Sequence, residues 1–195
     1  MAKSSGGVRN EKSNPNQRIQ RIIAKFESRI KDDKKETLYV VGSRGDILAE
    51  EKGSKDQVVI PRSAMKLIKN NVVIHNHPSA TKRRGIERIG QSFSLADIHT
   101  AVTGDAKEMR AVTTTYVFSL KRPKKGWGNF KEIHKEYQQA EKEVYAKLSK
   151  YIRWYKGDKD TAYARANVLH FNLITKKVAK KFGWKYSHKK HNYGK

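Results

Sequence analysis

Two histidines, His75 and His77, stand one residue apart at the end of an apolar run. The run predicts a strand over 72–77 that Pro78 ends. Alternate side chains of a strand project from the same face, so both imidazoles are expected to point the same way. Two neutral imidazoles on one rigid element form half of a site for a divalent metal, above all zinc. Their place at the strand end would leave the metal open to solvent and substrate.

Ser94 and Asp97 are candidates for the rest of this chemistry. A catalytic zinc takes a third protein ligand and keeps water in the fourth position, and Asp97 could be that ligand. Ser-x-x-Asp at the start of a helix is also the pattern of a capping box. A His-x-His pair on a strand is often only exposed or hydrogen-bonded. Both interpretations stay open for each motif alone, and the two motifs in this order favour the metal site.

The order Glu…His-x-His-Pro…Ser-x-x-Asp resembles the motif of the JAMM (MPN+/JAB) zinc metallohydrolases. The HNHPS form is most similar to the RadC-like branch and to the JAB domains of phage and prophage proteins. The resemblance covers about residues 15–120. It implies a cytidine-deaminase-like α/β sandwich with a zinc site at a strand edge.

The resemblance also implies a role for each motif residue. His75, His77 and Asp97 would bind Zn²⁺, and Ser94 would donate a hydrogen bond to the developing oxyanion. A glutamate upstream would act as general acid and base for a metal-activated water. The implied reaction is hydrolysis of an amide or isopeptide bond in a protein or peptide substrate.

Family members place this glutamate just before an apolar strand that follows a helix. Glu36 has that position here, ahead of the strand predicted over 38–41. Glu50 and Glu51, which end the next predicted strand, are alternatives. Glu36 could also be one more surface charge in the run KDDKKE.

The gap between His77 and Ser94 is longer than is usual in the family. The extra residues carry a basic cluster, made of Lys82, Arg83, Arg84 and Arg88. This cluster could contact a nucleic-acid backbone, an acidic substrate or an acidic partner. A solvated loop is the alternative interpretation.

The surrounding pattern predicts a mixed α/β or α+β domain that positions these residues. A helix over 15–30 is indicated by isoleucines and a phenylalanine on one helical face. The other expected elements are a hairpin over 38–41 and 47–51, a short third strand over 58–60, a brief helix over 63–70, the strand over 72–77, a helix over 95–103 and a strand pair over 109–113 and 116–120.

Charge and composition divide the chain further. Residues 1–14 are expected to form a disordered tail, 15–120 the metallohydrolase-like domain, 121–128 a linker and 129–195 a basic helical extension. The net charge is +24, and +15 of it falls on residues 121–195. An excess of this size attracts polyanions, so nucleic acid is a candidate partner of this region. Its aromatic residues could stack on bases, although packing between two helices is the more common use of such spacing.

Composition excludes several classes of protein. The chain has no cysteine, which rules out disulfides and Cys-ligated zinc. It also has no apolar stretch of the length needed to span a bilayer and no signal-like N-terminus, so a cytoplasmic location, or a virion if phage-encoded, is expected. The alternative function is a nucleic-acid-binding, virion-associated or assembly protein that keeps the fold with little or no peptidase activity.

Overall fold

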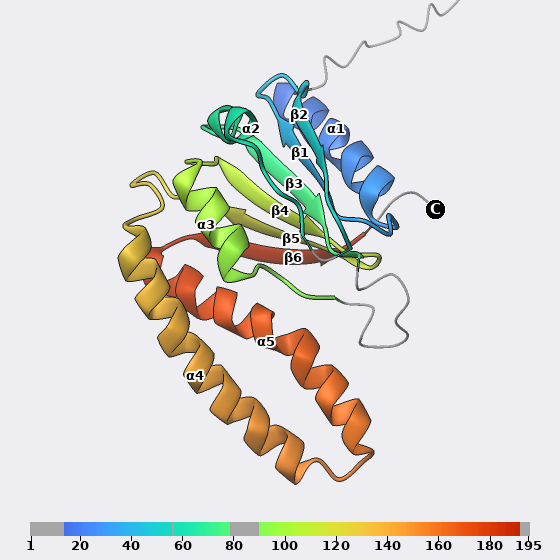
Figure 1. Cartoon of the computed structure of the whole chain (residues 1–195), viewed down its shortest axis with the longest axis vertical. Helices are drawn as coiled ribbons and strands as arrows, with labels where there is room; N and C mark the ends of the chain where they lie inside the picture. The colour runs from blue at the N-terminus through green and yellow to red at the C-terminus, as the bar shows by residue number, and fades with distance from the viewer. Residues whose placement is uncertain (1–13, 56, 79–89, 192–195) are drawn as a thin grey trace, which may run out of the picture.

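The computed structural model describes residues 14–55, 57–78 and 90–191, and within them the chain forms one six-stranded sheet flanked by helices (Figure 1). The strands are β1 (Thr37–Val41), β2 (Ile47–Lys52), β3 (Val72–Asn76), β4 (Glu108–Val112), β5 (Tyr116–Lys121) and β6 (Lys185–Lys190). The helices are α1 (Pro15–Ile30), α2 (Arg62–Leu67), α3 (Leu95–Thr103), α4 (Phe130–Trp154) and α5 (Lys159–Phe182).

The sheet has the order β2-β1-β3-β4-β5-β6 and is mixed. Only β3 and β4 run parallel, and the chain between them contains α3, because parallel neighbours need a crossover connection. The remaining neighbours pair antiparallel. Gly45, with a φ of 90°, closes the tight turn between β1 and β2. The motif strand β3 is therefore held on both sides, by β1 and by β4.

Each face of the sheet packs against its own set of helices (Figure 1). Helix α1 covers one face, where Ile23 and Ile30 meet the side chains of Tyr39 and Ile74. Helices α3, α4 and α5 contribute to the larger core on the other face, whose strand residues are Leu38, Val40, Val73, Met109, Ala111, Phe118 and Leu120. Alternation along the strands thus separates two cores.

Helices α4 and α5 form a hairpin that extends beyond the sheet (Figure 1). Its base is fixed by two buried tryptophans: the Trp127 indole donates to the Ala106 carbonyl, and the Trp184 indole donates to the Trp127 carbonyl. Asn129 and Asp158 cap the N-termini of the two helices through their side chains. None of the helices in the described ranges has the length and apolar character needed to cross a membrane.

The predicted mixed α/β class is confirmed, and α1 has the predicted bounds. The predicted third strand over 58–60 is wrong, because these residues lie outside any strand. Val58 and Ile60 pack partly against the core, while Val59 is 77% exposed. The alternation of buried and exposed side chains therefore comes from packing of one side of an extended segment that pairs with no neighbouring strand in the described ranges. Strand β6 was not predicted from its sequence KYSHKK. Charged residues are typical of such an edge strand, and five of its six residues are exposed, so the strand has no apolar alternation that a sequence pattern could reveal.

Candidate metal centre

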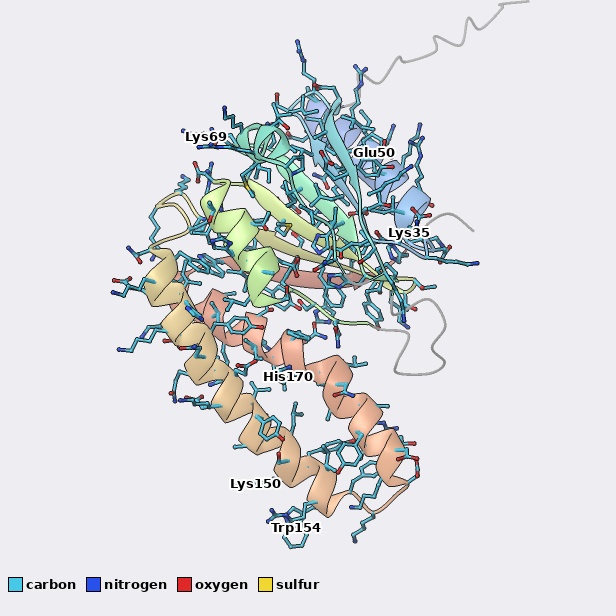
Figure 2. All side chains as sticks on the ribbon, in the orientation of Figure 1. Lys35, Glu50, Lys69, Lys150, Trp154 and His170 are labelled. Atoms are coloured by element: carbon cyan, nitrogen blue, oxygen red, sulfur yellow. The ribbon has the colours of Figure 1, made fainter. Side chains whose placement is uncertain are left out.

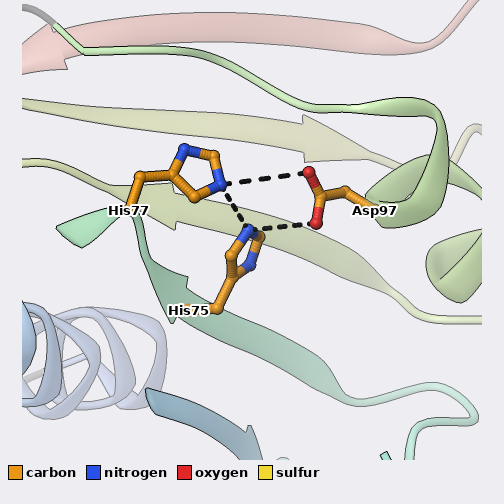
Figure 3. A group of neighbouring side chains, drawn as sticks. All are labelled: His75, His77 and Asp97. Atoms are coloured by element: carbon orange, nitrogen blue, oxygen red, sulfur yellow. Dashed lines mark hydrogen bonds and ion pairs between the residues drawn. The ribbon is translucent and has the colours of Figure 1, made fainter. Parts of the chain in front are cut away.

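Three predicted ligands, His75, His77 and Asp97, converge on one point (Figure 3). The Nε2 atoms of the two histidines are 3.0 Å apart, and Asp97 Oδ1 lies 3.2 Å from His75 Nε2. Asp97 Oδ2 lies 3.9 Å from His77 Nε2. One donor atom from each residue falls within 4.8 Å of the other two, so the group could hold a metal ion.

The local fold explains this convergence. His75 lies on the central strand β3, between Leu38 of β1 and Ala111 of β4 in the ladder, and it is 1% exposed. His77 follows two residues later and projects to the same face. Asp97 lies in the first turn of α3, the crossover helix that packs on that face. His75 and Asp97 therefore come from a paired strand and a capped helix. His77 directly follows the strand, and its backbone N–H still donates to the Val112 carbonyl of β4.

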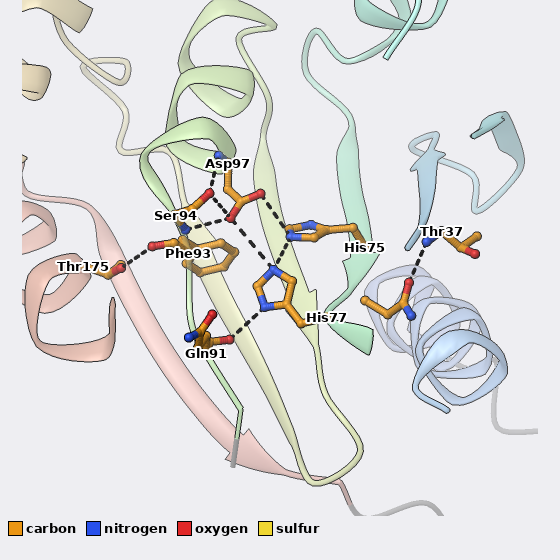
Figure 4. Close-up of polar contacts among 9 residues, drawn as sticks. Thr37, His75, His77, Gln91, Phe93, Ser94, Asp97 and Thr175 are labelled. Carbon is orange, nitrogen blue, oxygen red and sulfur yellow. Dashed lines mark hydrogen bonds and ion pairs between the residues drawn. The ribbon is translucent and has the colours of Figure 1, made fainter. Parts of the chain in front are cut away.

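Ser94 and Asp97 form the capping box that the sequence allowed (Figure 4). The Ser94 backbone N–H and hydroxyl both donate to Asp97 Oδ2, at 2.7 and 2.8 Å, and Asp97 N–H donates to Ser94 Oγ at 3.2 Å. The other oxygen, Oδ1, faces His75. Capping and ligation are therefore compatible: the cap fixes the carboxylate that faces the histidines. The expected role of Ser94 as an oxyanion donor stays a prediction.

His77 is oriented from its far side by a backbone group. Its Nδ1 lies 2.9 Å from the Gln91 carbonyl oxygen (Figure 4). A carbonyl only accepts, so Nδ1 carries the proton and Nε2 of the neutral ring keeps its lone pair. That tautomer presents Nε2 to His75 and Asp97. Metal-binding histidines are commonly held by such a contact.

The pKa values of the three groups reflect their mutual contacts. Burial disfavours the charged form of His75, but the nearby Asp97 carboxylate, with Glu36, outweighs it and raises the pKa of His75 above 6.5. Burial and the neighbouring His75 lower the pKa of His77. Burial would raise the pKa of Asp97, yet contact with His75 and His77 holds it well below its usual value. Asp97 is thus ionised and His77 neutral, which are the forms that bind metal.

Glu36 lies in the same cavity as the three predicted ligands. The cavity has a volume of about 290 Å³, and its wall includes Glu36, His75, His77, Ser94 and Asp97. Glu36 precedes β1 and is 8% exposed. Its backbone N–H donates to the Ser54 carbonyl, and its carbonyl accepts from Gly53 N–H, at 2.7 Å each. The backbone that carries this carboxylate is therefore fixed.

Glu50 and Glu51, the alternatives to Glu36, do not line the cavity. Both lie on the outer strand β2. Glu50 pairs with Tyr39, whose ring contacts Phe26 of α1, so Glu50 is on the opposite side of the sheet from the histidines. Figure 2 shows Glu50 near α1. Glu51 pairs with Leu38 and is only partly buried.

Asn76, between the two histidines, has a structural role that its sequence context did not indicate. Its side chain points to the other face and is fully buried. Asn76 Oδ1 accepts from the Thr37 N–H at 2.6 Å, and Nδ2 donates to the Lys35 carbonyl at 3.1 Å. These are the peptide groups on either side of Glu36. Strand β3 and the residue that follows it thus supply the two histidines and the clamp that fixes the Glu36 segment.

The C-terminal elements hold the segment that precedes α3. Thr175 of α5 donates to the Phe93 carbonyl at 3.3 Å (Figure 4). The Tyr186 hydroxyl of β6 contacts Ser92 Oγ at 2.8 Å and donates to Asn172 Oδ1 at 2.6 Å. Phe171 of α5 also lines the cavity. The basic C-terminal region therefore contributes to the wall and the support of the candidate centre.

The predicted basic cluster of Lys82, Arg83, Arg84 and Arg88 lies outside the described residues. The remaining predicted site residues are Glu36, His75, His77, Ser94 and Asp97, and all of them line one cavity. Searches of protein-family models, of curated proteins and of solved structures found no match to this chain.

Proposed function

We propose that the protein is a zinc-dependent hydrolase of the JAMM type that cleaves an amide or isopeptide bond, on a cytidine-deaminase-like JAB sandwich. The observation that carries the proposal is the convergence of His75, His77 and Asp97 in a cavity that also contains Glu36. Two nitrogens and one carboxylate oxygen are a donor set that zinc takes in catalytic sites. A second carboxylate beside them is what general acid–base chemistry needs.

The charges of the cavity fit a divalent cation. Asp97 and Glu36 are two acidic groups, and the neutral His77 adds a lone pair. His75 Nε2 faces both the Nε2 lone pair of His77 and the Oδ1 atom of Asp97. A proton or a metal ion can lie between these atoms. The residues present therefore suit Zn²⁺, which would be held by His75, His77 and Asp97.

When bound, the metal supplies Lewis-acid chemistry: it polarises a carbonyl and acidifies water. Glu36 takes the proton of the attacking water and returns it to the leaving amine. Ser94 orients Asp97 through its two hydrogen bonds to Oδ2. The Gln91 carbonyl holds the His77 ring in the tautomer with a free Nε2 lone pair.

The test begins with the metal content of the protein purified without added metal. We expect about one zinc per chain in the wild type, loss of it in His75→Ala/His77→Ala, and retention in the matched control His188→Ala, which changes an exposed histidine on β6. The Glu36→Gln variant should bind zinc normally.

Activity is then measured on a panel of isopeptide-linked and peptide substrates. Wild-type cleavage that Glu36→Gln abolishes, with zinc still bound, would support the hydrolase. Absence of metal from the purified protein, together with no uptake of added zinc, would contradict the proposal. Zinc binding with equal cleavage by wild type and Glu36→Gln would contradict the role of Glu36.

A further inference from the structure

The far half of α4 carries a run of cations. Between Val144 and Gly157 the chain has no Asp or Glu, and it has four basic residues spaced three apart. These residues are Lys147, Lys150, Arg153 and Lys156, and all four are exposed. This part of the α4–α5 hairpin lies beyond the sheet (Figure 1). The hairpin therefore presents positive charge on a projecting arm.

An exposed tryptophan shares a face with two of these cations. Trp154 is 78% exposed, four residues after Lys150 and seven after Lys147. Residues with these spacings lie above one another on a helix. Figure 2 shows Lys150 and Trp154 at the far end of α4. The same face thus presents ammonium groups and a flat aromatic ring.

Helix α5 adds lysines to this face. A hollow of about 400 Å³ between the helices is lined by Lys147 of α4 and by Lys176, Lys177 and Lys180 of α5. Lys177 pairs with Glu143. Within the described ranges, the other three lysines of the hollow have no carboxylate within ion-pair distance. Positive charge therefore extends from the tip of α4 onto α5.

Among the aromatic residues of this region, some are fully buried and others are exposed. Trp127, Tyr137 and Trp184 are buried and pack in the core. Trp154, Tyr145 and Tyr163 are 78%, 69% and 55% exposed. Packing in the core accounts for the buried residues, whereas the rings of the exposed ones face solvent.

We propose that the basic face formed by Lys147, Lys150, Trp154, Lys176 and Lys180 binds single-stranded nucleic acid. The ammonium groups contact phosphates, and Trp154 stacks on a base, which is the combination that single-strand binding proteins use. The carboxylates of an acidic protein segment would engage the lysines but would not stack on the exposed ring, whereas every base of a nucleic acid has a π-face. Duplex bases are already stacked, so the ring favours a single strand. This inference does not depend on the metal centre.

The test measures binding of a fluorescein-labelled oligothymidylate, about 20 nucleotides long, to the full chain at several salt concentrations. We expect the affinity to fall steeply with salt. The variant Lys147→Gln/Lys150→Gln/Lys176→Gln/Lys180→Gln should reduce the slope of log affinity against log salt by about 0.7 for each phosphate that a lysine no longer neutralises. Trp154→Ala should weaken binding roughly tenfold.

Tyr163→Ala is the matched control. Tyr163 is also an exposed aromatic of the hairpin, but it lines a different hollow of about 570 Å³ together with Tyr145 and His170. Binding by this variant should be close to that of the wild type. An equal loss in Tyr163→Ala and Trp154→Ala would overturn the assignment to this face.

Intrinsic fluorescence gives a second readout. The chain has three tryptophans, and Trp127 and Trp184 are only 3% and 5% exposed. Quenching by the oligonucleotide should therefore report stacking on Trp154 and disappear in Trp154→Ala, while circular dichroism shows both proteins folded. Wild-type binding by Trp154→Ala would overturn the proposal. Equally effective competition by polyglutamate would overturn it in favour of an acidic protein partner.

Discussion

The two faces of the sheet each hold a cluster of charged or ionisable side chains at low exposure, and the two clusters differ in how their charges are balanced. On the α1 face, Arg110 contacts Glu27 and Glu108, each at 2.5 Å, and all three are at most 4% exposed. Ser119 donates to Glu108 at 2.7 Å, and Lys121 lies 3.5 Å from the same carboxylate. On the other face, Asp97 and Glu36 share a cavity with two histidines, and it is these imidazoles that face the Asp97 carboxylate.

This difference separates a structural use of buried charge from the binding use that we propose for the histidine face. A buried carboxylate is costly unless a cation or several donors accompany it. The α1 face contains its own cation, Arg110, so its cluster is complete within the chain. The opposite face places the imidazole nitrogens of two histidines beside the carboxylate oxygens of Asp97. A divalent ion bound to these atoms would balance the negative charge there. Adjacent strands, β3 and β4, carry the central residues of both clusters.

The largest effect is expected from breaking the complete cluster. Arg110→Met removes the cation and leaves two buried carboxylates, so we expect the free energy of unfolding to fall by about 3–5 kcal/mol, measured by urea denaturation. Lys121→Ala is the control, because Lys121 approaches Glu108 with a side chain that is 44% exposed and should cost less than about 1 kcal/mol. Equal losses in both variants would show that Arg110 is not the balancing charge.

The pH dependence of metal binding distinguishes the two faces further. On the histidine face alone, a bound metal ion should replace a proton, which is the proton of His75. The pKa of His75 is raised, so its proton stabilises the metal-free fold below pH 6.5, and that contribution is lost as pH rises through the raised pKa. Metal binding must displace this proton. Zinc affinity should therefore increase with pH, up to about tenfold per unit below the pKa of His75.

Calorimetric titration of zinc in buffers of different ionisation enthalpy measures this release. We expect proton release at pH 6 and little of it at pH values above the raised pKa. A zinc affinity that does not change across this range would contradict the ion pair between His75 and Asp97 in the metal-free protein.

Local sequence signals were sufficient for some parts of the fold and of the candidate centre. The spacing of Ile19, Ile22, Ile23, Phe26 and Ile30 predicted α1, because periodicity records a buried helical face. The His-x-His and Ser-x-x-Asp motifs predicted three groups that the structure brings together. Both signals depend on residues near one another in the sequence.

Features that depend on tertiary contacts were not predicted. The Gln91 carbonyl holds His77 through a backbone atom, and backbone atoms carry no residue-specific signal. Asn76 clamps Lys35 and Thr37, which are about 40 residues away in the chain. Strand β6 exists because β5 offers an edge for it, and its own residues show no strand pattern. Long-range pairing is therefore what the sequence pattern alone does not reveal.

The smallest effect is expected at the residues that hold the segment before α3 on the histidine face. They do so with neutral hydrogen bonds, whereas the other face uses ion pairs. Tyr186→Phe removes the hydroxyl between Ser92 and Asn172, so we expect a loss of about 1 kcal/mol in the free energy of unfolding. Burial raises the pKa of Tyr186 to about 12, so this hydroxyl keeps its proton at neutral pH.

The same change should also weaken zinc binding, because Ser92 adjoins Gln91, whose carbonyl orients His77. We expect zinc affinity to fall a few-fold in a chelator competition assay. The exposed control Tyr163→Phe should change neither the stability nor the zinc affinity. A loss of stability with unchanged zinc affinity would show that β6 supports the fold but not the orientation of His77.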